Sequence, residues 1–223
     1  MSNRYARILA AGGAAVLVAA LGVPAALAAA TAKTWTVQPG GVITATAGKT
    51  RLTNAAPGHP ITCVSSTATG TLRSGSGLPG AGAGSLSAIS FATCAYRVSN
   101  TLLIVFTVQP GGLPWHVNLS SYNAATGVVR GTVSHIAITL SDSTSPGGCR
   151  AVVDGTSATA DDGRVVFRYT DSTGQLMVLA TGGNLHYYDV SKGCVAVGMF
   201  HDGDPAALSA TLTVSPKQAI TSP

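Results

Sequence analysis

The sequence LLIVFTVQPGGLPWHVNLSSY occupies residues 102–122, and the rest of the chain is organised around it. Its first seven residues are nearly all apolar and are rich in β-branched types, which is typical of a strand buried on both faces. A Pro-Gly-Gly turn and a Leu-Pro-Trp corner follow, and from His116 the residues alternate with the period of a strand. We therefore predict that residues 102–108 form the central strand of one shared core and that Trp115 closes its end.

Short alternating segments continue on both sides and end at turn dipeptides such as Asp154-Gly155, Asp162-Gly163 and Asp202-Gly203. All eight acidic residues are Asp and Glu is absent, a composition that favours strands and turns over solvated helices. About a dozen short strands of this kind predict an all-β fold, and we expect a disulfide-stapled antiparallel β-sandwich, Ig-like or jelly-roll-like. Cys194–Phe200 should be one of its strands, and residues 73–84, with five glycines, should be a surface loop.

The first residues have the pattern of a secretory signal peptide, predicted over residues 1–32. Two arginines precede an apolar run over residues 8–27, and small-x-small motifs predict cleavage after Ala28 or Ala32. No later apolar run has the length of a transmembrane helix, so no membrane span is expected after removal of the signal. Residues 33–223 should then form a single secreted, extracellular domain that either is released or associates with the cell wall.

One hexapeptide occurs twice. TVQPGG lies at residues 36–41 and again at 107–112, each time upstream of a cysteine, Cys63 or Cys149. The spacing from hexapeptide to cysteine differs between the two copies. The sequence therefore leaves open whether the domain contains two pseudo-repeated halves that meet near residues 101–107.

Four cysteines, Cys63, Cys94, Cys149 and Cys194, are an even number in a chain expected to be exported, which predicts two disulfides. Of the three pairings we favour Cys63–Cys94 and Cys149–Cys194, because each pair lies within one half of the chain. In the chain-entropy model, the loop from Cys63 to Cys94 and the loop from Cys149 to Cys194 each predict roughly 3.5–4 kcal/mol of stabilisation by the disulfide that closes them. The cysteines are too far apart in the sequence for the usual spacing of a zinc site.

Charge and motifs argue against several classes of function. The thirteen basic residues are scattered singly and form no patch in the sequence, so no nucleic-acid partner is expected. The chain lacks the Gly-x-Ser-x-Gly motif of a serine hydrolase. Asp161 and Asp162, which are adjacent, would point to opposite faces of a strand and could not act together on a glycoside. We therefore predict no catalytic residues, no cofactor and no enzyme activity.

The Asp202 and Asp204 carboxylates, in the sequence His-Asp-Gly-Asp, are the best metal-binding candidates. Their spacing resembles a fragment of a calcium loop with oxygen ligands. The chain has no acidic residue after Asp204 that could complete such a loop. A hydrated turn is the favoured interpretation, so the sequence predicts no metal site.

Aromatic side chains are the best candidates for ligand binding. Trp115, His116 and Tyr122 come from one stretch, and Tyr187 comes from the second half of the chain. Such side chains can stack on a flat ligand in a groove. Packing in a β core accounts for Trp115 and Tyr187 as well.

Several motifs resemble a group of small secreted β-rich proteins of actinobacteria. The motifs are Trp35–Gly41, Leu52–Leu72, Gly112–Trp115, Val153–Ala160 and Ala180–His186, and the likeness covers essentially the whole mature chain. A fainter likeness, through the cysteine strand and the Leu-Pro-Trp corner, is to the exported alkane-oxidation activator proteins. The resemblance implies export and a β fold, and it transfers no site residue.

Together these patterns predict a secreted, non-enzymatic β protein that binds an extracellular or cell-wall partner or contributes to the cell-surface layer. Two alternatives remain. One is a carrier of a small ligand in an aromatic groove, and the other is an inhibitor of an extracellular enzyme that presents residues 73–84. A well-formed pocket would favour the carrier, whereas a flat apolar patch would favour a protein partner.

Overall fold

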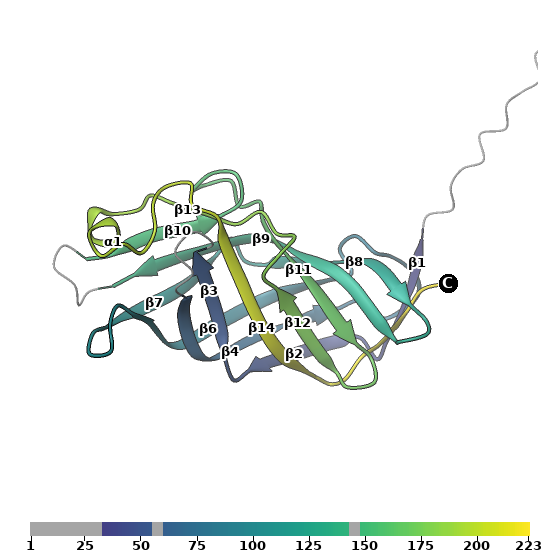
Figure 1. Cartoon of the computed structure of the whole chain (residues 1–223). Coiled ribbons are helices and arrows are strands. Elements are labelled where there is room, and N and C mark those ends of the chain that lie inside the picture. Colours follow the sequence, from purple (N-terminus) through teal and green to yellow (C-terminus); the bar gives the residue numbers. More distant parts are fainter. Residues whose placement is uncertain (1–32, 55–59, 143–147) are drawn as a thin grey trace, which may run out of the picture. The chain divides into compact units, whose positions relative to one another are not determined.

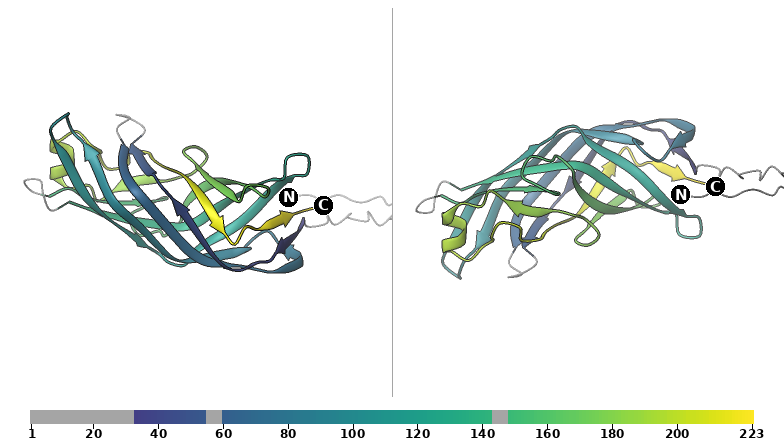
Figure 2. Two further views of the ribbon diagram at one scale, coloured as in Figure 1. Left: turned by 90° about the horizontal axis from the view of Figure 1, so that it is seen from below. Right: turned by 90° about the horizontal axis from the view of Figure 1, so that it is seen from above.

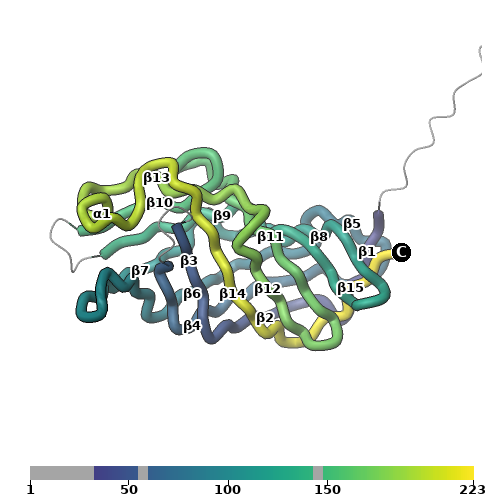
Figure 3. The backbone as a smooth tube through the Cα atoms, in the orientation of Figure 1, coloured from purple at the N-terminus to yellow at the C-terminus, as the bar shows by residue number. Residues whose placement is uncertain are grey.

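The computed structural model describes residues 33–54, 60–142 and 148–223, which belong to one compact unit (Figures 1 and 3). The expected signal peptide lies outside the described residues. The elements are β1 (Thr34–Gln38), β2 (Gly41–Ala47), β3 (Thr50–Asn54), β4 (Pro60–Leu72), β5 (Gly75–Pro79), β6 (Gly84–Arg97), β7 (Leu103–Gly111), β8 (Trp115–Asn123), β9 (Val128–Ser141), β10 (Arg150–Asp154), β11 (Gly163–Thr170), β12 (Gln175–Leu179), β13 (His186–Tyr188), α1 (Lys192–Ala196), β14 (Ala206–Ser215) and β15 (Ala219–Thr221). A search of these described ranges finds no helix of the length and apolar character needed to cross a membrane.

The strands close into an eight-stranded antiparallel β-barrel, in the order β2, β4, β6, β8, β9, β11, β12 and β14 (Figures 1 and 2). The barrel closes because β14 returns to β2, with Thr213 opposite Thr46 and Ser215 opposite Thr44. The all-β class is confirmed, but the expected β-sandwich is wrong. A sandwich leaves edge strands on both sheets, whereas here the last long strand pairs with the first.

Several positions in the barrel wall are filled by two strands in succession. β2 and β3 both pair with β4 and β14, so β3 continues the line of β2 beyond a break at residues 48–49. In the same way, β7 and β8 both lie between β6 and β9, and β10 and β11 both pair with β9. The barrel strands are therefore longer and more bent than the short segments that the sequence suggests.

One end of the barrel is covered by a small sheet in the order β15-β1-β5. Trp35 and Val37 of β1 and Ile220 of β15 are buried there. We refer to this as the β1 end. Because β5 pairs with β1, residues 73–84 do not form the free loop that the glycines predict.

The opposite end, the α1 end, is held by both disulfides. Cys63–Cys94 joins β4 to β6, and Cys149–Cys194 joins the residue before β10 to α1, the pairing favoured from the sequence. Cys194–Phe200 was expected to be a strand, but it begins inside α1 and continues as irregular chain. A helical turn advances about 1.5 Å per residue, so it fits residues into the short span across the barrel end where an extended strand would overshoot.

β7 contains the apolar run that was expected to be buried on both faces. Ile104 and Phe106 are buried, but Leu103 is 50% exposed and Val105 is 52% exposed. That expectation is wrong, because a strand in a barrel wall has only one face toward the interior. Trp115 at the start of β8 is buried, as expected of a side chain that closes the core.

Candidate functional site: a cavity inside the barrel

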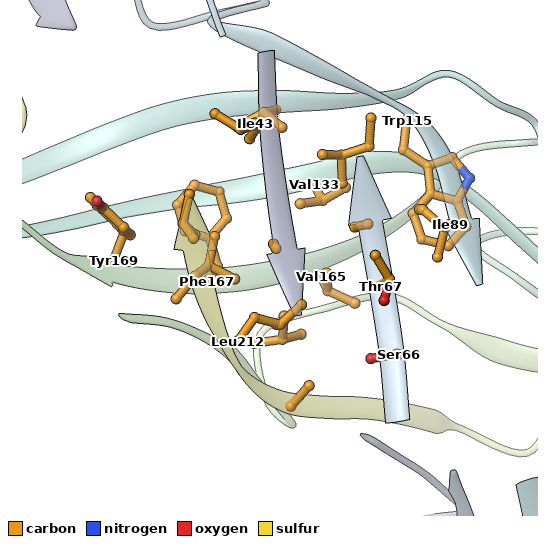
Figure 4. Close-up of a pocket in the computed structure, with 18 of the residues that line it drawn as sticks. Ile43, Ser66, Thr67, Ile89, Trp115, Val133, Val165, Phe167, Tyr169 and Leu212 are labelled. Carbon is orange, nitrogen blue, oxygen red and sulfur yellow. The ribbon is translucent and has the colours of Figure 1, made fainter. Parts of the chain in front are cut away.

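The interior of the barrel contains a cavity of about 120 Å³ with an almost entirely apolar lining (Figure 4). β11 shows how the sequence produces this lining, because Val165, Phe167 and Tyr169 are buried. The alternating positions Arg164 and Arg168 are exposed, and Val166 is half-buried. The same period-two alternation on each strand brings apolar side chains from all sides to one interior space. Other lining residues include Ile43, Ala45, Ala68, Val117, Val133, Leu208, Leu212 and Val214.

Trp115 forms part of one wall of the cavity. Its indole Nε1 donates a hydrogen bond of 2.7 Å to the carbonyl oxygen of Gly111. This bond satisfies the one polar group of the indole, so the ring can present apolar surface to the interior. Gly112, at φ +64°, supplies the left-handed backbone conformation with which the chain passes from β7 toward β8.

On the side of β3 and β4 the lining includes three residues with hydroxyl groups, Thr50, Ser66 and Thr67, and two of these hydroxyls pair with each other. Thr50 Oγ1 and Ser66 Oγ lie 2.6 Å apart, and the two residues are only 3% and 7% exposed. Thr50 begins β3 opposite Cys63, and Ser66 lies opposite Ala47 at the end of β2. The two hydroxyls therefore meet where the line of β2 passes into β3.

At the β1 end, a second polar cluster holds the chain between β14 and β15 against the barrel. The Tyr169 hydroxyl donates to the carbonyl oxygen of Gln218 at 2.9 Å and accepts from its backbone N–H at 2.8 Å. The side-chain oxygen of Gln218 accepts from the N–H of Gly40, and its side-chain nitrogen donates to the carbonyl oxygen of Pro216. Burial raises the pKa of Tyr169, so the phenol stays neutral and keeps its proton as a donor.

The hydrogen-bonded wall is interrupted next to the cavity. β6 pairs with β8 over residues 84–86 and with β7 over residues 94–97. Between these ladders, the described residues 87–93 make no pair toward β7 or β8, although residues 88–92 pair with β4 on their other side. Ile89 and Phe91 lie on this stretch, line the cavity and are half-buried.

The four aromatic candidates from the sequence do not come together in one groove. Trp115 lines the cavity, whereas His116 is exposed on the outer face, with its ring centroid 4.3 Å from that of His135. Tyr122 is half-buried beside a shallow surface hollow at the β1 end. Tyr187 is buried at the α1 end, where its ring stacks on that of Phe200 at 4.3 Å between centroids.

Asp202 and Asp204 hold the chain between α1 and β14. Asp202 Oδ1 accepts a hydrogen bond from the N–H of Val190, while Asp204 Oδ2 accepts from Asn54 Nδ2 at 2.7 Å and from the N–H of His201 at 2.8 Å. Burial by itself would raise the pKa of Asp204, but the hydrogen bonds from His201 and Asn54 and the charge of His201 lower it overall. The described part of the chain contains no group of three or more His, Cys, Asp or Glu side chains that could hold a metal ion.

The sequence analysis did not single out Thr50 or Ser66. Both lie in segments rich in Thr and Ser, where nothing marks which hydroxyls face inward. In β4, Cys63 and Ser66 are both buried although they lie three positions apart, so the alternation changes phase between them. β4 keeps one register with β6 through this stretch, with Cys63 opposite Cys94 and Ser66 opposite Phe91, so no β-bulge marks the change, and the local sequence pattern does not reveal it.

The fold and the cavity define the class of protein: an eight-stranded up-and-down β-barrel with an apolar interior. The chain matches no protein-family model, no curated protein and no solved structure. The likeness to secreted actinobacterial proteins therefore stays a prediction.

Proposed function

We propose that this protein is a secreted binding protein whose barrel interior holds a small apolar molecule. The observation that carries the proposal is the cavity of about 120 Å³ with its apolar lining. Eight-stranded barrels have an interior just wide enough to be filled by side chains or to hold one small ligand. The apolar signal-peptide pattern and the two disulfides support export to an oxidising environment.

The volume limits the ligand to a compact molecule. An apolar cavity of about 150 Å³ in another protein stays dry and binds benzene or xenon, so a similar size applies here. Removing about 200 Å² of apolar ligand surface from water gains about 5 kcal/mol. That free energy corresponds to a dissociation constant of about 0.2 mM.

Access to the cavity is proposed to run between β6 and the β7–β8 line. The wall lacks ladder hydrogen bonds there over residues 87–93, so separating the strands breaks none. Ile89 and Phe91 offer apolar surface along this path. The β1 end and the α1 end are less suitable, because the Tyr169–Gln218 hydrogen bonds and the Cys149–Cys194 disulfide hold them.

Methylenecyclohexane, with seven carbon atoms and no polar group, is a suitable probe. We expect saturable changes in the methyl NMR signals of Ile43, Val133 and Leu212, with a dissociation constant of about 0.1–1 mM. Ala45→Leu fills the cavity from β2 and should abolish these changes. Thr46→Leu adds a leucine at the next, outward-facing residue and should bind like the wild type.

Two results would refute the proposed function. One is the absence of saturable methyl shifts in the wild type up to the solubility limit of the probe. The other is equal binding by Ala45→Leu and Thr46→Leu, because a ligand on the outer surface would not be displaced by a side chain that fills the interior.

A further inference from the structure

The hydrogen bond between Thr50 and Ser66 uses only one of the two hydroxyl protons of the pair. Each hydroxyl carries one proton, and a single contact of 2.6 Å between the two oxygens uses only one of them. Whichever residue donates in that contact, the proton of the other has no acceptor among the described residues. Both side chains are more than nine-tenths buried and belong to the cavity lining.

A buried donor without an acceptor is costly, about 1–3 kcal/mol. A single water molecule would need two to four polar partners to be held well. Apart from Thr67, the lining near this pair is apolar, so a water bonded to the pair would keep part of its own hydrogen-bonding capacity unsatisfied. A ligand with one acceptor oxygen and an otherwise apolar body fits both the spare proton and the surrounding surface.

We propose that the natural ligand is a compact, uncharged molecule with one carbonyl or ether oxygen, which accepts a hydrogen bond from the Thr50–Ser66 pair. This inference rests on the proposed function and specifies the chemistry and orientation of the ligand. The oxygen lies against β3 and β4, and the apolar body extends toward Phe167 and Leu212.

Ionised ligands do not fit this site. The lining contains no Lys, Arg, His or Asp side chain that could neutralise a carboxylate or an amine. Moving an unpaired charge from water into such surroundings costs several kcal/mol or more. The two hydroxyls together supply one free donor, which is sufficient for a neutral oxygen acceptor and insufficient for a carboxylate.

Cyclohexanone and methylenecyclohexane form a matched pair of probes, because they differ only in an oxygen replaced by a CH₂ group. The double variant Thr50→Val/Ser66→Ala removes both hydroxyls and leaves no orphaned partner, so it should fold with nearly unchanged stability. The control Thr46→Val/Ser65→Ala makes the same changes at exposed positions next to the pair. Affinities are measured by methyl NMR titration of each variant with each probe.

We expect the cavity double variant to weaken cyclohexanone binding by about fivefold to tenfold, the worth of one hydrogen bond. Methylenecyclohexane should bind this variant as well as the wild type or more tightly. The control variant should bind both probes like the wild type.

The outcomes separate this inference from the proposed function. If both probes bind the wild type but the cavity double variant changes their affinities equally, the acceptor site is refuted and the binding function stands. If neither probe binds the wild type, the binding function itself fails. If cyclohexanone binding weakens equally in both double variants, the hydroxyl pair is not the anchor.

Discussion

Side-chain hydrogen bonds hold the barrel wall together in addition to the hydrogen bonds between strands. Replacing Asp154, at the end of β10, tests one group of them. Its side chain is completely buried. Oδ1 accepts hydrogen bonds from the backbone N–H groups of Gly155, Asp162 and Gly163 at 2.6, 3.2 and 3.0 Å, and Oδ2 accepts from that of Asp161 at 2.9 Å. One carboxylate thus ties together both ends of the connection between β10 and β11, which share one position in the barrel wall.

Asp154→Ala would remove both acceptor oxygens and with them all four hydrogen bonds. The N–H groups of Gly155 and Gly163 are bonded in buried surroundings, whereas those of Asp161 and Asp162 are partly accessible to water. A buried donor without a partner costs about 1–3 kcal/mol, so the two buried groups predict a loss of about 2–6 kcal/mol in the free energy of unfolding. Asp154→Asn keeps one acceptor oxygen and can retain three of the bonds in weaker, neutral form, so it should lose roughly half as much.

Urea unfolding followed by tryptophan fluorescence measures these losses, and the dependence on urea concentration should keep its slope. Asp161→Asn is the matched control, because it makes the same chemical change at an exposed neighbouring residue. The control should shift the free energy of unfolding by no more than about 0.5 kcal/mol. If Asp154→Ala lost less than about 1 kcal/mol, the two buried N–H groups would not depend on this carboxylate, and the reasoning would be refuted.

Three further predictions concern pH, the disulfides and access to the cavity. Burial, and secondarily the charge of Asp204, raises the pKa of Tyr187. The contribution of the neutral phenol to the free energy of unfolding should therefore be complete below pH 10 and decrease as the pH rises above 10. At pH 11 Tyr187 contributes about 1.4 kcal/mol to this loss, so between pH 8 and pH 11 the free energy of unfolding of Tyr187→Phe should fall by about 1.4 kcal/mol less than that of the wild type. Replacing Cys63 and Cys94 together by Ala should cost roughly 3.5–4 kcal/mol, and peptide mapping without reduction should recover these two cysteines linked to each other; linkage to other cysteines would contradict the topology. Ile89→Trp should slow the association of methylenecyclohexane in NMR exchange measurements while leaving the barrel folded, and unchanged association would exclude the path between β6 and the β7–β8 line.

Parts of this architecture could be predicted from local patterns in the sequence. Period-two alternation and the absence of Glu indicate strands, and the turn dipeptides separate them. The pairing Cys63–Cys94 followed from proximity in the sequence, and both residues indeed lie opposite each other on adjacent strands. These features are local or join near neighbours, so the sequence carries them directly.

Much less of the candidate site could be predicted from the sequence. Trp115 was singled out as an aromatic residue, but its relation to Thr50, Ser66 and Phe167 depends on four strands that are distant in the sequence. Tyr187 was grouped with it on chemical grounds, yet the chain places it at the α1 end against Phe200. Residue type identifies what a side chain can do, while strand order and register decide which side chains share a cavity.

The sequence by itself determined that the chain is built of strands, which cysteines pair, and where the turns fall, because these follow from backbone preference and short-range chain entropy. Only the tertiary structure decided that the sheet closes. An inward-facing apolar residue looks the same in the sequence of a sandwich and of a barrel, and closure depends on β14 meeting β2 from the other end of the chain. The two copies of TVQPGG illustrate the difference: the first turns the chain from β1 into β2, and the second ends β7 within the barrel wall. The cavity exists because closure faces all the apolar sides toward one another, and Ser66 enters its lining through a change of phase in the burial pattern of β4 that the local sequence does not show.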